Sequence, residues 1–217
     1  MWVEGLLVCA GLVALLAARR VWVGYPPPPA HVRVLGRREF GFLTAAADTV
    51  FPPGGAISAS GSDAEVAERT DVWIGEVAPF LRVLMRLLFF LVEHATLFFP
   101  APGRRGFRRF SSLDAAQREA VMSGWAESSL GPRRLVFESL RAVLTMSYLS
   151  DPAVLRELGV APRDIEPGYC EADLLFPPIG HGPDAIRIEP EDLRDVEAPA
   201  TLACDAPLDP RYAAPRA

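Results

Sequence analysis

The three histidines are the side chains best suited to acid–base or metal chemistry, and they lie far apart in the sequence. They are His31, His94 and His181. A carboxylate-bridged metal pair in a helical bundle needs Glu-x-x-His on one helical face, whereas Glu93 directly precedes His94. We therefore expect His94 to be a structural residue of a helix, and the sequence predicts no metal site.

Motifs of catalysis and cofactor binding are also absent. The chain has no G-x-G-x-x-G, no G-x-x-x-x-G-K-[ST], no C-x-x-C-H and no G-x-S-x-G. Its cysteines, Cys9, Cys170 and Cys204, form no C-x-x-C pair, and only the last two could form a disulfide. The sequence therefore predicts a chain without catalytic residues and without a bound cofactor.

Two arginine clusters remain as candidates for binding. One combines four arginines with two phenylalanines, and its members are Arg104, Arg105, Phe107, Arg108, Arg109 and Phe110. It predicts contact with anionic lipid heads or with an acidic partner surface; the alternative is a solvated turn anchored by one phenylalanine. The other, Arg37-Arg38-Glu39-Phe40, resembles a twin-arginine export motif, but Asp48 and Pro52 interrupt the apolar run that must follow. We expect this second cluster to begin a helix.

The elements that would position these arginines begin with an apolar segment. It starts with Glu4 and ends in Arg19-Arg20, the reverse of the charge order in a secretory signal peptide. Because its length matches the roughly 20 helical residues that cross a bilayer, we expect residues 1–25 to form a retained transmembrane anchor. A buried or interfacial helix is the alternative. The residues expected to contact lipid are Trp2, Leu6, Leu12, Leu16, Arg19, Arg20 and Trp22, with Tyr25 in an interfacial belt.

Composition limits the size and the partners of the remaining chain. The 217 residues leave room for one globular domain after the anchor. The formal net charge of -5 disfavours binding to nucleic acid. The chain has no lysine, which we interpret as the result of a GC-rich coding sequence rather than of function.

Hydrophobic periodicity predicts an all-α fold. A proline-rich linker over residues 26–36 is expected to hold a small helical bundle-like domain, residues 37–160, off the bilayer. Residues 161–217 are expected to form an irregular tail, partly disordered or wrapped around a partner. The predicted helices cover about residues 37–50, 64–77, 79–99, 111–128 and 133–149, with a short helix between Asp151 and Gly159.

Particular residues are expected to start these helices or to face the core. Asp63 is the expected N-cap of the second helix, and Ser111 or Ser112 that of the fourth. The buried faces of the first and fifth helices are expected to consist of Phe40, Leu43, Ala47 and Val50, and of Val136, Leu140, Val143, Leu144 and Ser147.

The helix expected over residues 79–99 is very apolar but carries charge. At about 100° per residue, Arg82, Arg86 and Glu93 fall on one side and form a polar stripe. We expect this stripe to face solvent or a partner protein; an interfacial helix lying on lipid is the alternative.

Three segments, taken together, carry a resemblance to a known family. The first contains Ala47-Asp48-Thr49-Val50-Phe51-Pro52-Pro53, the second begins Arg109-Phe110-Ser111-Ser112-Leu113-Asp114, and the third is Tyr148-Leu149-Ser150-Asp151-Pro152. In this order and spacing they resemble the gluconate 2-dehydrogenase small-subunit family, over about residues 37–160.

That resemblance implies a non-catalytic partner of a large flavin-dependent oxidoreductase of the glucose–methanol–choline type. The large subunit holds FAD and oxidises an alcohol or sugar hydroxyl, and a cytochrome c subunit often accepts the electrons. We therefore expect an accessory subunit that binds, stabilises and tethers such an enzyme. Contact with the partner or with lipid is expected at Arg82, Arg86, Arg104, Arg105, Arg108 and Arg109.

Two alternatives and the cellular location stay open. The chain could instead be a membrane-anchored assembly or export factor that acts transiently on such a client; a free-standing enzyme is disfavoured. We expect a single-pass protein of the bacterial inner membrane. The charge bias favours a cytoplasmic domain, whereas the resemblance favours a periplasmic one.

Overall fold

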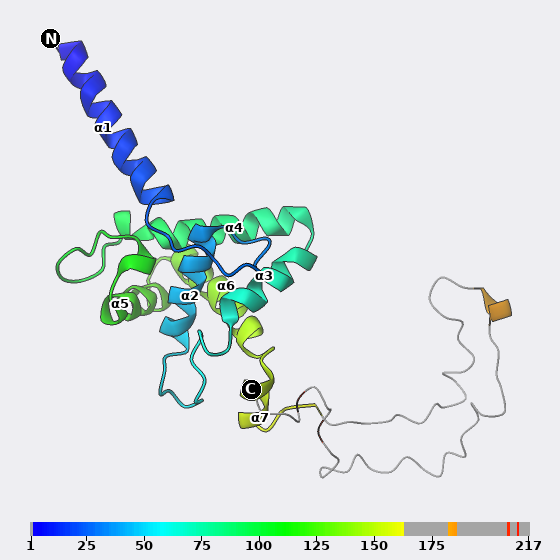
Figure 1. Ribbon diagram of the computed structural model, residues 1–217. Helices are drawn as coiled ribbons and strands as arrows, with labels where there is room; N and C mark the ends of the chain where they lie inside the picture. The colour runs from blue at the N-terminus through cyan, green and yellow to red at the C-terminus, as the bar shows by residue number, and fades with distance from the viewer. Residues whose placement is uncertain (1, 163–181, 186–207, 209–211, 213–217) are drawn as a thin grey trace. The chain divides into compact units, whose positions relative to one another are not determined.

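The computed structural model describes residues 2–162, 182–185, 208 and 212 (Figure 1). In this part of the chain the α-helices are α1 (Trp2–Trp22), α2 (Arg37–Val50), α3 (Val66–Glu76), α4 (Pro79–His94), α5 (Ala115–Ala126), α6 (Gly131–Tyr148) and α7 (Pro152–Glu157). Short 3-10 turns are η1 (Ala95–Leu97), η2 (Phe110–Ser112) and η3 (Pro183–Ala185). The prediction of an all-α fold is confirmed.

The chain divides into two units, Met1–Leu158 and Gly159–Ala217. All seven α-helices named above belong to the first unit. Most of the predicted irregular tail, including Cys170 and Cys204, lies outside the described residues.

Two helices begin at aspartates whose side chains accept from free N–H groups of the first turn. Asp114 accepts from the N–H of Gln117 at 2.9 Å and starts α5, and Asp151 accepts from the N–H groups of Ala153 and Val154 and starts α7. The predicted caps Asp63 and Ser111 or Ser112 are wrong. Asp63 instead accepts from Ser60, so α3 starts two residues later than expected.

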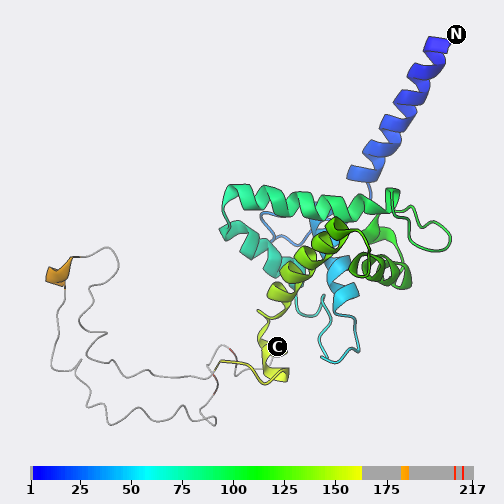
Figure 2. The same ribbon diagram turned by 180° about the vertical axis from the view of Figure 1, so that it is seen from behind.

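The core forms where α2 crosses α4 and the η2 turn (Figures 1 and 2). The α6 helix packs against both α3 and α5. Phe42 of α2 lies at its centre, and its ring centroid is 5.9 Å from that of Phe89 and 5.7 Å from that of Phe110. Sequence periodicity placed Phe40 on this face, but Phe42 is fully buried and Phe40 only partly. On α6 the predicted residues Leu140, Val143, Leu144 and Ser147 are buried, and Val136 packs at the edge.

The linker over residues 26–36 differs from the expected free spacer. Asp71 of α3 is buried, and its carboxylate accepts hydrogen bonds from the backbone N–H groups of Arg33, Val34 and Leu35 at 2.9, 2.8 and 2.7 Å. Leu35 is buried in the core as a result. The second half of the linker is therefore part of the folded domain.

Replacing Asp71 with alanine should destabilise the domain by about 2–4 kcal/mol, because three backbone donors lose their acceptor at once. Urea unfolding of the wild type and of Asp71→Ala measures the difference. The matched control is Asp114→Ala, which removes an exposed N-cap and should cost about 1 kcal/mol. Equal losses for the two variants would contradict this role of Asp71.

Candidate interaction surface

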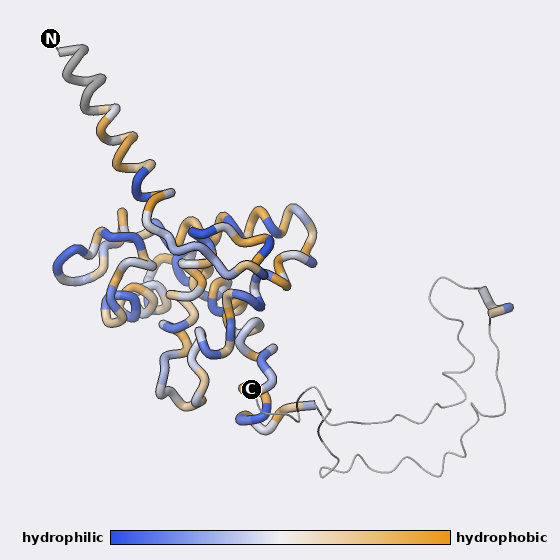
Figure 3. The backbone as a smooth tube through the Cα atoms, viewed as in Figure 1, coloured by the Kyte–Doolittle hydropathy of each residue, from blue (hydrophilic) through white to orange (hydrophobic). Residues whose placement is uncertain are grey.

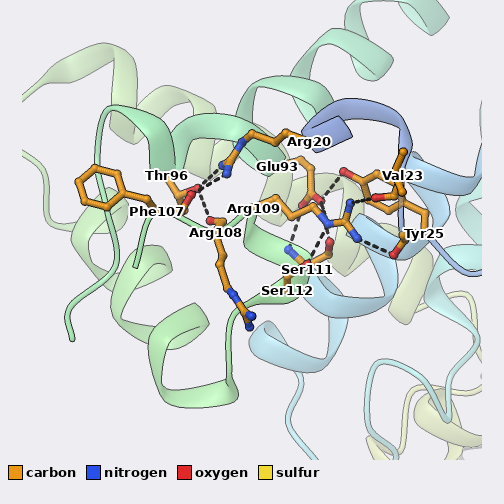
Figure 4. Close-up of polar contacts among 11 residues, drawn as sticks. Arg20, Val23, Tyr25, Glu93, Thr96, Phe107, Arg108, Arg109, Ser111 and Ser112 are labelled. Atoms are coloured by element: carbon orange, nitrogen blue, oxygen red, sulfur yellow. Dashed lines mark hydrogen bonds and ion pairs between the residues drawn. The ribbon is translucent and has the colours of Figure 1, made fainter. Parts of the chain in front are cut away.

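A buried carboxylate, Glu93 of α4, organises the polar contacts inside the domain (Figure 4). It accepts from the hydroxyl of Tyr25 at 2.8 Å, from the hydroxyl of Ser111 at 2.6 Å and from the N–H of Ser111 at 2.9 Å. The guanidinium of Arg109 lies 3.8 Å away and supplies the opposite charge. The network joins α4, the η2 turn and the segment that follows α1.

Arg109 also fastens the end of α1 to the domain. Its guanidinium donates to the carbonyl oxygens of Val23 and Gly24, at 2.6 and 2.5 Å, and lies 3.7 Å from the ring centroid of Tyr25. Arg20 makes a second attachment, donating to the carbonyl of Phe107 at 2.6 Å and to the hydroxyl of Thr96 at 2.8 Å (Figure 4). Two arginines thus hold the last turn of α1 and the residues after it.

Burial perturbs the titration of the groups in this network. It raises the pKa of Glu93, while the hydrogen bonds from Ser111 and Tyr25 and the charge of Arg109 act in the opposite direction. Burial and the nearby Glu93 carboxylate raise the pKa of Tyr25. Tyr25 was expected in a membrane-interface belt, but it is buried and hydrogen-bonded, so that expectation is wrong.

The three charged residues of the polar stripe of α4 all bond to other parts of the domain. Glu93 is fully buried, and Arg86 donates two hydrogen bonds to the buried carboxylate of Glu39, at 2.7 and 3.0 Å. Arg82 donates to the carbonyl oxygens of Ile74 and Gly75 at the end of α3. For Glu93 the expectation of a solvent- or partner-facing group is therefore wrong, because its side chain is buried in the domain. Arg82 and Arg86 hold α4 against α3 and α2, and their contact with a partner or lipid stays a prediction.

The opposite face of α4 is apolar and exposed. Figure 3 shows the alternation of hydrophobic and hydrophilic residues along this helix. The exposed side chains follow the i, i+3, i+4, i+7 spacing of one helical face, and they are Phe80, Val83, Leu84, Leu87 and Leu91. Phe80 and Val83 are 71% and 63% exposed, and Phe98 after η1 is 82% exposed. We call this set, from Phe80 to Phe98, the α4 apolar face.

The arginine cluster of residues 104–110 splits into inward and outward members. Phe110 is buried against Phe42, and Arg109 is bound in the network. Arg104, Arg105, Phe107 and Arg108 are exposed. The exposed arginines stay candidates for contact with a partner or lipid, and the buried Phe110 fits the alternative of an anchored turn.

The first helix is partly described at the level of side chains. Leu12, Leu16, Arg19 and Trp22 are exposed, whereas the side chains of Trp2 and Leu6 lie outside the described residues. Within the part of the chain that the structure describes, no helix combines the length and the hydropathy needed to cross a membrane. This finding differs from the transmembrane anchor expected over residues 1–25.

His94 is the histidine with the most unusual surroundings. It is buried at the end of α4, its ring lies 4.6 Å from that of Phe90 in an edge-on arrangement, and neither ring nitrogen has a hydrogen-bond partner among the described residues. Burial, with the charges of Arg20, Arg38 and Arg109, lowers its pKa to about 4. Nothing in the sequence signalled this environment, because it arises from side chains of three other segments.

Comparison with known proteins and a search for metal ligands gave no assignment. The described residues contain no group of three or more His, Cys, Asp or Glu side chains that could hold a metal ion. Comparisons with protein-family models, with curated proteins and with solved structures found no match.

Replacing Arg109 with lysine should cost about 1–3 kcal/mol of stability, because an ammonium cannot reproduce the planar fork that binds two carbonyls. It should also speed chymotryptic cleavage after Trp22, since the segment after α1 loses its attachment. Arg108→Lys, at an exposed neighbouring position, is the matched control and should change stability by no more than about 0.5 kcal/mol. Unchanged cleavage in Arg109→Lys would contradict the attachment.

His94 should make the domain less stable as the pH falls from about 6.5 to about 4. In this window the unfolded chain binds a proton on His94 and the folded chain does not, so acidification favours unfolding, by about 1–3 kcal/mol. Urea unfolding over a pH series measures the slope, which His94→Phe should reduce. His31→Phe, at an exposed histidine, should leave the slope unchanged; the same slope in His94→Phe and wild type would contradict the prediction.

Proposed function

We propose that this chain is a non-catalytic accessory subunit that binds and stabilises a larger flavin-dependent oxidoreductase of the glucose–methanol–choline type and tethers it to a membrane. The partner would carry the FAD, and a cytochrome c is a further expected member of the complex. The observation that supports an accessory role is the α4 apolar face, which presents hydrocarbon to solvent while Glu93 of the same helix is buried and Arg86 binds Glu39 of α2.

The α4 apolar face has the composition of a protein–protein interface. Its centre contains aliphatic and aromatic side chains without charge, and aromatic residues are enriched at interface centres. The exposed Arg104, Arg105 and Arg108 belong to the loop beside η1, since Thr96 donates to the carbonyl of Arg108. They would form a polar rim around an apolar centre, which is the common anatomy of such surfaces.

In this proposal α1 attaches the domain to the membrane. Its described apolar side chains, Leu12, Leu15, Leu16 and Trp22, are exposed, and Arg19 stands beside them. Apolar groups flanked by arginine favour attachment to an anionic membrane surface. Because Arg20 and Arg109 hold the end of α1, a lipid-bound α1 would keep the domain close to the membrane.

The nature of the partner rests on the sequence resemblance alone. The three segments that carry it meet in the core: Phe110 contacts Phe42 of α2, and the rings of Phe51 and Tyr148 stack at 3.9 Å. A flavoprotein partner is therefore the part of the proposal that most needs an experiment.

The proposal is tested by purifying a tagged chain from its native host. We expect a flavoprotein to co-purify and to give the preparation the yellow colour of FAD. A triple variant, Phe80→Ser, Val83→Ser and Leu84→Ser, should reduce the recovered flavin at least about tenfold. Because these side chains are already exposed, thermal unfolding should change little.

Val72→Ser is the matched control, since Val72 is a 68% exposed apolar residue on α3. It should leave flavin recovery unchanged. A wild-type chain that comes down alone and colourless would contradict a stable complex; loss of a flavoprotein in a deletion strain would then favour the transient assembly factor.

A further inference from the structure

An apolar groove opens between the end of α1, α4, η1 and α6. Its volume is about 590 Å³, within the range of small-molecule sites. Most of its lining is hydrocarbon, contributed by Val21, Leu87, Leu91, Phe98 and Val136 among others. Such a wall suits an aliphatic chain.

Residues that line this groove carry most of the buried polar atoms that lack a partner in the described chain, although the atoms themselves are covered by protein. They are both ring nitrogens of His94, Nε1 of Trp125, Nε of Arg20 and Nε of Arg133. His94 is 7% and Trp125 4% exposed, so hydration from bulk solvent is restricted. Buried polar atoms without partners are rare, so their concentration around one groove marks an unusual part of the domain.

The charges at the groove favour an anion as that ligand. Among the described residues neither Arg20 nor Arg133 has a carboxylate within ion-pair distance. The guanidinium of Arg133 is held flat at one end, 4.1 Å from the ring centroid of Phe99 and 5.2 Å from that of Trp125. Its side chain makes no hydrogen bond within the described chain, so its fork stays available to a planar acceptor such as a carboxylate.

We propose that the groove binds a single-chain fatty acid, with the hydrocarbon tail along the apolar wall and the carboxylate accepting from the terminal N–H groups of Arg133 at one end. The tail gains the burial of its methylene groups against the apolar wall. The head supplies the guanidinium of Arg133 with a counter-ion, which it lacks among the described residues. This assignment does not require a flavoprotein partner, and its test uses the chain alone. Leu87, Leu91 and Phe98 belong both to the groove and to the α4 apolar face, so a partner bound there would cover one wall of the groove.

Trp125 provides the signal that tests this proposal. The 217-residue chain carries Trp2→Phe, Trp22→Phe and Trp73→Phe, is kept in solution by an amphipathic polymer, and is titrated with palmitate below its micelle concentration. We expect a saturable change in Trp125 emission. Hexadecanol, with the same tail and a neutral head, and octanoate, with the same head and a short tail, should each bind at least about tenfold more weakly.

A pair of arginine variants on α6 separates binding of the head from general effects. Arg133→Gln should weaken palmitate binding about tenfold and leave hexadecanol binding unchanged. Arg141→Gln, at an exposed arginine that pairs with Glu138, should change neither. Circular dichroism checks that each variant is folded, and Arg133→Lys, which keeps the charge without the fork, should lie between wild type and Arg133→Gln.

Three results would overturn the proposal. One is the absence of saturable palmitate binding, and a second is equal affinity for palmitate and hexadecanol. The third is an equal effect of Arg133→Gln and Arg141→Gln. Displacement of palmitate by phosphatidylglycerol as effectively as by myristate would overturn the assignment to a single-chain ligand.

Discussion

The buried carboxylate of Glu93 is the constraint from which the rest of the arrangement follows. A carboxylate in a core needs donors and a positive charge, since burying it without them costs several kcal/mol. Tyr25 supplies a donor from the segment after α1, and Ser111 and Arg109 supply donors and charge from the η2 turn. Satisfying one side chain therefore fixes the residues after α1, the η2 turn and the rotation of α4 about its axis.

The rotation of α4 determines what the molecule presents to its surroundings. Once Glu93 points inward, Arg86 and Arg82 on the same side reach Glu39 and the end of α3. The apolar stripe from Phe80 to Leu91 is then left exposed. An ordinary amphipathic helix turns its apolar side to the core; α4 buries Phe89 and Val92 beside its charged groups and exposes a second apolar side to its surroundings.

Local sequence signals were enough to predict most helices, but not which side of α4 points into the core. The ends of α2 and α6, the proline in the first turn of α6 and the Asp151 cap of α7 follow from short-range rules that act within a few residues. The sequence correctly placed Arg82, Arg86 and Glu93 on one side of α4, but it did not predict that Glu93 points into the core. Direction depends on Tyr25 and Arg109, which lie 68 residues before and 16 residues after Glu93, and periodicity carries no such information.

The candidate site was less predictable than the fold for the same reason. The exposed arginines at 104, 105 and 108 were identified as a cluster, yet Arg109 in the same run is structural. The partnerless nitrogens around His94 could not be anticipated, because a sequence lists donors but not which of them find acceptors. The segments that resemble a known family contribute to packing, since Phe51 and Tyr148 stack on each other. They are therefore evidence for a fold more than for a partner.

The outward apolar face has a consequence for the life of the protein in the cell. Uncovered hydrocarbon of this kind is what chaperones hold and what quality-control proteases recognise in unassembled chains. A chain that folds into this arrangement is therefore best made alongside whatever covers it. Copies whose apolar stripe stays exposed would be degraded. The amount of this chain in the cell should therefore match the amount of the molecule that covers the stripe.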